Sequence, residues 1–428
     1  MRCPTLNALP PPPEGKAGWP WTEETSWVPE NMPDGKPWPK ISIVTPSYNQ
    51  GRFIEETIRS VLLQGYPDLE YIIIDGGSTD KTVEIIQKYE PWITFWTSEP
   101  DGGQTNAINK GFKRSTGAIV AWLNSDDLYT AGALRTAATV FAEQPRSAVV
   151  YGEIDTVDAD TSILSHIKSR KFNLEELYRS DYIPQPASFI SAEAIKKIGF
   201  LDERFHYAMD YDLWVRLGQK GAVMQYIPKK LAWFRLHGSS KSVSQREAFW
   251  PEEFMLFDMA LKRDASNASL AGIAYSHMFR LLIFSHISQQ SHEILRCTST
   301  NTINDDIEVA FYQQPLQEVL RLVSMDHLHP KDNFPLPEAL REVYRAFDTE
   351  YNGGGNNHST DIESRWVDEQ LILLPNYLLS LEEKTESIRL YKKLIRKCPS
   401  LLRYPQTYRF PARCVARTNL ISKIRGIQ

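Results

Sequence analysis

The stretch GAIVAWLNSDD at residues 117–127 passes from apolar to acidic within a few positions. Residues 117–123 have the continuous apolar character of a buried strand. Packing does not explain carboxylates at the end of such a strand, because an unpaired charge is costly to bury. Carboxylate oxygens at this point suit a divalent cation, which in turn can hold a diphosphate. The alternative for Asn124 to Asp127 is a turn and a helix cap, since Asn, Ser and Asp favour both.

Strand and helix patterns alternate on the N-terminal side of this stretch. Strand patterns occupy 41–45, 71–74, 93–97 and 118–123, and helical spacing of apolar residues occupies 53–62, 79–89 and 105–114. Such alternation predicts a mainly parallel sheet with helices on both faces. Ligands of these sheets bind beyond the carboxyl ends of the strands, so we expect the loops there to carry the function.

The rest of the chain has a less regular pattern. Further strand patterns lie at 149–151 and 187–190, helical patterns lie at 192–198 and 211–217, and the pattern beyond about residue 247 is mostly helical. We therefore expect an extended Pro- and Trp-rich segment at 1–39 across the domain surface, an α/β domain at 40–245, and a helical region at 246–428.

Composition excludes several classes of protein. The chain of 428 residues is 42% hydrophobic and 24% charged with a net charge of -5, which predicts a soluble globular protein that does not bind nucleic acid. Its four cysteines are widely spaced and predict free thiols in a reducing cytosol rather than a zinc or redox motif. We expect neither a signal peptide nor a membrane-spanning helix.

The end of the chain is strongly basic. Residues 387–428 hold eleven Lys and Arg and no Asp or Glu. Such a stretch can contact an anionic membrane surface. The alternative is a solvated helix face against an acidic patch of the same protein.

Polar loops follow the predicted strands. They are TPSYN at 45–49, DGGSTD at 75–80 and DGGQ at 101–104. Asp75 at a strand end can accept a hydrogen bond from an imide N–H such as that of uracil, and the glycines let a flat base approach the backbone. Helix starts with glycines suit anions. Each loop could singly be a capping turn, but loops after successive strands of one sheet converge on one crevice.

Together with NSDD at 124–127 and MDYDLW at 209–214, these loops resemble the family 2 glycosyltransferases of the GT-A fold, in family order over roughly residues 40–240. The resemblance implies a Rossmann-like mixed sheet flanked by helices and followed by a helical region. It implies metal-dependent inverting transfer of a sugar, usually from a UDP-sugar, to a hydroxyl of a saccharide or lipid-linked acceptor. Such an enzyme would serve polysaccharide synthesis in the cytoplasm, at the inner face of the membrane.

The resemblance also implies roles for individual residues. Contacts with the nucleotide sugar would come from Thr45, Pro46, Tyr48, Asn49, Asp75, Gly102, Gln104, Asn109, Lys110, Asn124, Ser125 and Asp126. Asp210 matches the catalytic base, and its alternative role is an N-cap. Asp126 would hold Mn²⁺ or Mg²⁺, and His237 would reach the metal or the diphosphate, unless it is structural. Arg235 and Lys241 could neutralise phosphate charge.

Three positions depart from the family pattern. Asn124 replaces the first Asp of the family's D-x-D motif, Gly76 replaces the second residue of its common double Asp, and Met209 replaces the acidic residue before the base. Asp127 could compensate for Asn124 or cap the next helix. Asn124 and Met209 motivate an alternative function, a catalytically inactive nucleotide-sugar-binding or interaction protein. A nucleotidyltransferase is less attractive, because the chain lacks a Gly-rich activation loop with an Arg/Lys pair.

Overall fold

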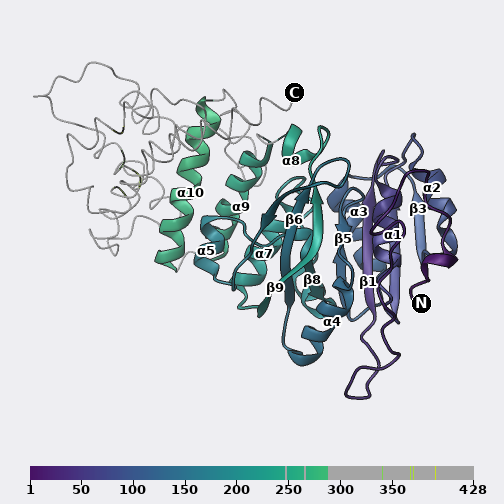
Figure 1. Cartoon of the computed structure of the whole chain (residues 1–428). Helices are drawn as coiled ribbons and strands as arrows, with labels where there is room; N and C mark the ends of the chain where they lie inside the picture. The colour runs from purple at the N-terminus through teal and green to yellow at the C-terminus, as the bar shows by residue number, and fades with distance from the viewer. Residues whose placement is uncertain are drawn as a thin grey trace, which may run out of the picture. The chain divides into compact units, whose positions relative to one another are not determined.

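The computed structural model describes residues 1–245, 248–264 and 267–287, together with Leu340, Val367, Gln370 and Tyr391. The chain divides into two compact units, Met1–Phe249 and Trp250–Gln428 (Figure 1). Most of the predicted helical region lies outside the described residues. The same holds for Cys297, Cys398 and Cys414 and for the basic stretch 387–428, apart from Tyr391.

The first unit contains a mixed sheet of nine strands in the order β3-β2-β1-β4-β8-β6-β9-β5, with β7 paired to β6. The strands are β1 (Ile41–Ser47), β2 (Leu69–Asp75), β3 (Phe95–Ser98), β4 (Ile119–Trp122), β5 (Leu128–Tyr129), β6 (Val149–Val157), β7 (Ile163–Ile167), β8 (Ser188–Ser191) and β9 (Met224–Arg235). β1 to β4 are parallel to one another, as the alternating pattern predicts.

In the second half of the sheet, β6 and β9 run in the same direction as β1 to β4. β8 is antiparallel to both β4 and β6, so β6 runs in the direction of β4, and β9 is parallel to β6. All of β1 to β4, β6 and β9 therefore end at one edge of the sheet, which we call the carboxyl edge. The loops that follow these strands are brought to this edge.

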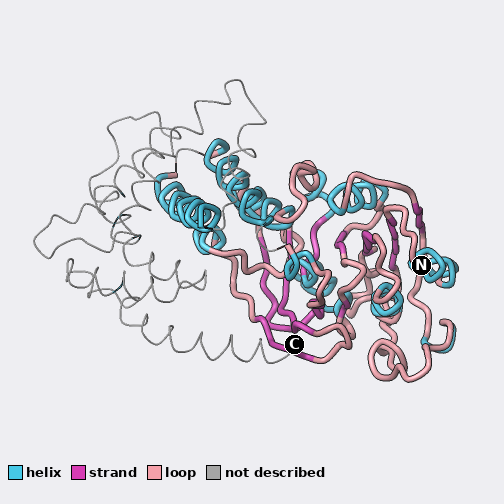
Figure 2. The backbone as a smooth tube through the Cα atoms, turned by 90° about the horizontal axis from the view of Figure 1, so that it is seen from above, coloured by secondary structure: helices cyan, strands magenta, loops and turns pink. Residues whose placement is uncertain are grey.

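Helices cover both faces of the sheet (Figure 2). In the first unit they are α1 (Ile54–Leu62), α2 (Thr82–Lys88), α3 (Gln104–Arg114), α4 (Ala133–Glu143), α5 (Leu174–Arg179), α6 (Ala192–Ile198), α7 (Met209–Gln219) and α8 (Lys241–Ser244), with short 3-10 turns at Leu6–Ala8, Glu90–Trp92 and Gln185–Ala187. Side chains of α1 and α4 share one buried cluster with the sheet. Gly111 of α3 lies against Val44, whose neighbours Ile43 and Thr45 point the other way, since successive strand residues face opposite sides.

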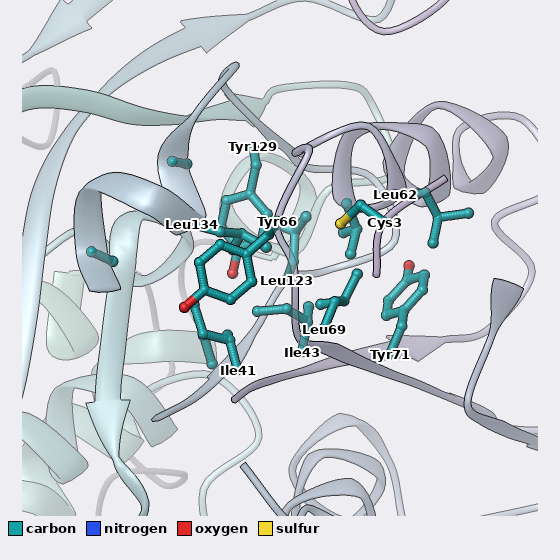
Figure 3. Close-up of a cluster of buried hydrophobic side chains, with 14 of the residues drawn as sticks. Cys3, Ile41, Ile43, Leu62, Tyr66, Leu69, Tyr71, Leu123, Tyr129 and Leu134 are labelled. Atoms are coloured by element: carbon teal, nitrogen blue, oxygen red, sulfur yellow. The ribbon is translucent and has the colours of Figure 1, made fainter. Parts of the chain in front are cut away.

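The N-terminal segment contributes to the core in addition to covering the surface. Cys3 is buried between residues of β1, β2 and α1 (Figure 3). The buried guanidinium of Arg59 in α1 donates to the carbonyl oxygens of Pro10, Pro20 and Trp21. Backbone carbonyls that would otherwise be desolvated are thus satisfied by one side chain, which fixes the course of the segment.

Predicted and observed elements differ mainly at their ends. The helix predicted from residue 79 begins at Thr82, and Asp80 just before it accepts a hydrogen bond from Thr82 N on Oδ1 at 2.9 Å. The strand predicted at 149–151 continues to Val157, paired with β7 and β9.

Two further helices are described at the end of the first unit and in the second, α9 (Phe249–Arg263) and α10 (Ala268–Ile287). His277 of α10 lies 2.9 Å from a carboxylate oxygen of Glu253 and packs against Phe257, with 4.5 Å between ring centroids and the rings tilted by 40°. No helix within the described residues is both long and apolar enough to cross a membrane.

Candidate active site

Asp126 and His237 meet at the carboxyl edge. Asp126 follows β4 and His237 follows β9, and His237 Nε2 lies 3.0 Å from Asp126 Oδ2. The other ring nitrogen of His237 lies 2.9 Å from Ser239 Oγ, and the ring packs against Phe53 at 4.5 Å between centroids. Ser239 and Phe53 therefore hold the imidazole in an orientation that directs Nε2 toward the Asp126 carboxylate.

The chemistry of this pair fits a divalent cation. A carboxylate oxygen and an imidazole nitrogen are ligands that Mn²⁺ accepts, and Mg²⁺ is commonly held by one or two carboxylates plus substrate phosphates. Within the described residues Asp126 Oδ1 makes no hydrogen bond, and no larger group of His, Cys, Asp and Glu gathers as a metal site. The protein can thus supply two ligands here.

Asp127 has a different role from Asp126. Its side chain is fully buried, Oδ1 accepts from Arg235 N at 2.9 Å, and Oδ2 accepts from Asn124 Nδ2 at 3.2 Å. Burial, and then the charge of Asp126, raise the pKa of Asp127 well above its usual range. Oδ1 therefore joins the loop after β4 to the end of β9, and Oδ2 holds that loop to itself, so both carboxylate oxygens of Asp127 have partners within the protein.

Arg235 does not face phosphate, contrary to the expectation from sequence. It is 1% exposed, and Nη2 forms an ion pair of 2.7 Å with Glu56 of α1. Nε donates to Asp126 O at 2.8 Å, and Nη1 donates to the carbonyl oxygens of Asp158 and Ala159. Since these groups follow β4 and β6, Arg235 ties together the ends of three strands from inside the protein.

The loops after β1 and β2 are joined by Asn49. Its backbone is left-handed with φ +52°, Asn49 Oδ1 accepts from Thr79 N at 2.9 Å, and Asn49 N donates to Ser78 Oγ at 2.7 Å. Tyr48 next to it is 62% exposed, although large aromatic side chains are usually buried. The loop thus presents a flat aromatic surface to solvent at the carboxyl edge.

Asp75, at the end of β2, organises its own loop. The carboxylate is buried and accepts hydrogen bonds from Gly77 N, Ser78 N, Ser78 Oγ and Ser98 Oγ. An incoming imide N–H could take the place of a serine hydroxyl, since the hydroxyls of Ser78 and Ser98 can rotate away.

Two predicted contact residues of β1 lie inside the core. Thr45 is fully buried, with its hydroxyl 3.1 Å from that of Tyr71, and Pro46 is buried as well. The Thr45 hydroxyl is therefore bonded within the core. Ser47, which was not predicted, is nearer the end of the strand, and its buried hydroxyl has no hydrogen-bond partner within the described residues. Its position in the TPSYN loop is the sequence feature from which Ser47 could have been predicted as a site residue.

The DGGQ loop shapes the start of α3. Gly103 has φ +98° and donates to Asp101 Oδ1 at 2.7 Å, while Gly102 N donates to Asn106 Oδ1 at 3.3 Å. A Cβ atom on Gly76 would lie 3.3 Å from the Asp101 carboxylate. The glycine that departs from the family pattern therefore leaves room for Asp101.

Two predicted contact residues of α3 have other partners. The Asn109 side chain is 3% exposed, and its amide pairs with the backbone of Leu201 and with Glu203. Lys110 lies 3.4 Å from Glu99 at the surface. Asn109 thus fixes the segment that leads into α7.

Asp210 lies in the first turn of α7 and is partly exposed. Asp210 Oδ1 accepts from Tyr211 N at 2.9 Å, which is a local contact. Asp212, two residues further on, is buried and forms an ion pair with Arg216 at 2.6 Å. The segment before α7 is held against α3, because Thr105 Oγ1 donates to Phe205 O.

Polar contacts also connect this segment to the loop after β4. Lys241 Nζ donates to His206 O at 2.9 Å and to Gln104 Oε1 at 3.0 Å, and Gln104 Nε2 donates to Asn124 Oδ1 at 2.8 Å. Asn124 shares its loop with the buried Ser125 and with Asp126. The segment before α7 and the loop after β4 are therefore linked through the side chains of Lys241 and Gln104.

Comparison with known proteins agrees with this architecture. Residues 42–197, from β1 to α6, match the model of glycosyl transferase family 2. An uncharacterized glycosyltransferase of Mycobacterium tuberculosis is 32% identical over 182 residues, which are 42% of this chain and 68% of that protein. The chain belongs to glycosyl transferase family 2.

Other relatives of this family 2 chain are matched over smaller shares of their length. An uncharacterized glycosyltransferase of Rickettsia typhi is 31% identical over 186 residues, 42% of this chain and 58% of that protein. The chondroitin synthase of Pasteurella multocida is 27% identical over 262 residues, 60% of this chain and 27% of that protein. The chain thus spans less than two thirds of these two relatives.

A solved structure has the same fold. The family 2 chain aligns with S. aureus TarS 1-349 in complex with UDP-GlcNAc at a TM-score of 0.51 and 18% identity, covering 83% of this chain and 90% of that one. The predicted GT-A fold is confirmed. The family match ends before Asp210 and His237, so the placement of these two residues rests on the structure.

Proposed function

We propose that the chain transfers a sugar, with inversion, from a nucleotide diphosphate donor to a hydroxyl of a saccharide or lipid-linked acceptor. The observation that supports this most is the contact of 3.0 Å between Asp126 and His237 at the carboxyl edge. Family membership and the link from this loop to the segment before Asp210 support it further.

Asp210 is the proposed general base. Inversion requires one carboxylate to take the proton from the acceptor hydroxyl while its oxygen attacks the anomeric carbon from the side opposite the leaving group. Asp210 stands in the first turn of α7, where the helix dipole favours a negative charge. The ionised carboxylate is the form that accepts the proton.

Asp126 and His237 would hold Mn²⁺ or Mg²⁺ beside the diphosphate. Such a cation, when bound, neutralises the charge that develops on the leaving diphosphate. Ser239 and Phe53 keep the imidazole of His237 in place, and Arg235 holds the Asp126 carbonyl from below the loop. The protein groups are thus placed before any ligand arrives, which lowers the cost of ordering them.

The proposed donor is a UDP-sugar. TarS, on the same fold, was solved with UDP-GlcNAc. Tyr48 is exposed and can stack on a flat base, and Asp75 with its rotatable serine partners can accept from the uracil imide.

The test is UDP release from a panel of UDP-sugars with Mn²⁺ and candidate saccharide acceptors. We expect turnover to fall by about a hundredfold or more in Asp210→Asn, which removes the base. The turnover of Asp126→Ala should fall by a similar factor, since this substitution removes a cation ligand. Asp68→Asn is the matched control, because Asp68 precedes β2 at the opposite edge of the sheet and its side chain is 42% exposed.

Unchanged turnover in both site variants would refute these assignments. UDP binding by the wild-type protein without any turnover would favour the alternative of a binding or interaction protein, which the replacements at Asn124 and Met209 motivate. The anomeric configuration of the product, read by NMR against that of the donor, tests inversion separately.

A further inference from the structure

Three side-chain amides form a connected series between β4 and α8. Gln185 Nε2 donates to Trp122 O at 2.8 Å, and Asn124 Nδ2 donates to Gln185 Oε1 at 3.2 Å. Gln104 Nε2 donates to Asn124 Oδ1 at 2.8 Å, and Lys241 Nζ donates to Gln104 Oε1 at 3.0 Å. We call these three amides the amide series; its members come from three separate parts of the sequence.

The groups at the two ends determine the orientation of every amide. A backbone carbonyl only accepts hydrogen bonds, so the nitrogen of Gln185 must face Trp122 and its oxygen must face Asn124. A lysine ammonium only donates, so the oxygen of Gln104 must face Lys241 and its nitrogen must face Asn124. Both ends lead to the same result, in which Asn124 donates on one side and accepts on the other.

We propose that Asn124 is a positioning residue whose amide is required, and not merely a tolerated replacement of the first Asp of the family's D-x-D motif. A carboxylate at 124 could accept from Gln104, but an ionised carboxylate has no hydrogen to donate to Gln185 Oε1, and Gln185 is only 8% exposed as a residue. The same amide nitrogen, which carries two hydrogens, also donates to Asp127 Oδ2 at 3.2 Å. Two buried acceptors therefore depend on one amide nitrogen.

The amide series connects the cation loop with the segment that carries the proposed base. Lys241, at one end, also donates to His206 O at 2.9 Å, four residues before Asp210. Its ammonium lies 5.2 Å from the ring centroid of Tyr207. Breaking the series at Asn124 should therefore displace groups on both sides of the proposed reaction without removing one that touches the reacting atoms.

The experiment compares one substitution at two positions. Asn124→Asp removes the required donor, whereas Asn173→Asp keeps what Asn173 supplies, an acceptor for Glu176 N at 2.9 Å at the start of α5. We expect Asn124→Asp to lower kcat about tenfold or more with a smaller change in KM for the donor, and Asn173→Asp to match the wild-type protein. An Asn124→Asp variant with wild-type or higher kcat would overturn the proposal.

A second variant covers the case in which Asn124→Asp does not fold. Gln104→Glu lies at the partly exposed start of α3, keeps an acceptor for Lys241 and removes the donor to Asn124. We expect its kcat to fall as well, although the new carboxylate gives Lys241 an opposite charge. Wild-type kcat in Gln104→Glu would also overturn the proposal.

The role assigned to Asn124 rests on the proposed function, and the two can fail separately. If the wild-type protein binds UDP with Mn²⁺ but transfers no sugar, the proposed function fails. The amide series is then judged by calorimetry with UDP and Mn²⁺. Weaker binding in Asn124→Asp than in Asn173→Asp supports the series, and equal or tighter binding overturns it.

Discussion

Replacing Glu56 by Gln tests the buried ion pair beneath the candidate site. Glu56 Oε2 lies 2.7 Å from Arg235 Nη2, with side-chain exposures of 7% for Glu56 and 0% for Arg235. Glu56 also accepts from Trp21 Nε1 at 3.1 Å and from Thr161 Oγ1 at 3.2 Å. The substitution preserves size and most hydrogen-bonding capacity but leaves the guanidinium without its opposite charge.

The expected loss of stability is large for a single isosteric change. Breaking a buried ion pair by removing one partner costs about 3–5 kcal/mol, because the remaining charge is desolvated and uncompensated. For a unit of this size that corresponds to a drop in Tm of about 6–20 °C. An exposed pair of the same chemistry contributes only about 0–1 kcal/mol.

The assay is thermal and urea unfolding of Glu56→Gln and of Glu99→Gln. Glu99 pairs with Lys110 at 3.4 Å, with side-chain exposures of 58% for Glu99 and 36% for Lys110, and serves as the exposed control. We also expect weaker Mn²⁺ binding in Glu56→Gln, because Arg235 holds Asp126 O at 2.8 Å. If both variants lose the same small amount of stability, the guanidinium is not dependent on Glu56 and the reasoning fails.

Three further predictions concern the described residues. Burial raises the pKa of the Cys3 thiol from 9.0 to about 12, so the folded state favours the protonated thiol. The free energy of unfolding should therefore fall as the pH rises above 9, where the thiol of the unfolded chain ionises. Alkylation of Cys3 by iodoacetamide at pH 8, followed by peptide mass spectrometry, should then be about a thousandfold slower than in urea, and similar rates would contradict its burial. His237→Gln should weaken Mn²⁺ binding in calorimetry by about tenfold or more while UDP affinity without Mn²⁺ is kept; unchanged Mn²⁺ affinity would exclude His237 as a ligand. Gly111→Ala should lower Tm, because the new Cβ would lie 2.4 Å from Val44 Cγ1, and overpacking costs about 1–3 kcal/mol against a helix-propensity gain of about 1 kcal/mol. A Tm equal to wild type would show that Val44 can move aside.

The sequence by itself determined the first half of the sheet and the loops that carry chemistry. Continuous apolar runs predicted β1, β2 and β4, and the 3.6-residue period predicted α1 and α3 within a few residues of their observed ends. These signals are local, because a strand buried on both faces and a helix with one apolar face can each be recognised from neighbouring residues. The same local pattern was enough to predict which loops reach the carboxyl edge.

Only the tertiary structure decided how the polar side chains pair. Asp126 and His237 meet because two antiparallel steps through β8 return β6 and β9 to the direction of β4, and no local pattern records that geometry. For the same reason the sequence could not show that Arg235 is buried against Glu56, or that Asn109 is bound to the segment before α7. A charged or amide side chain has the same identity on the surface and in the interior, and its partners, which lie far away along the chain, determine which role it takes.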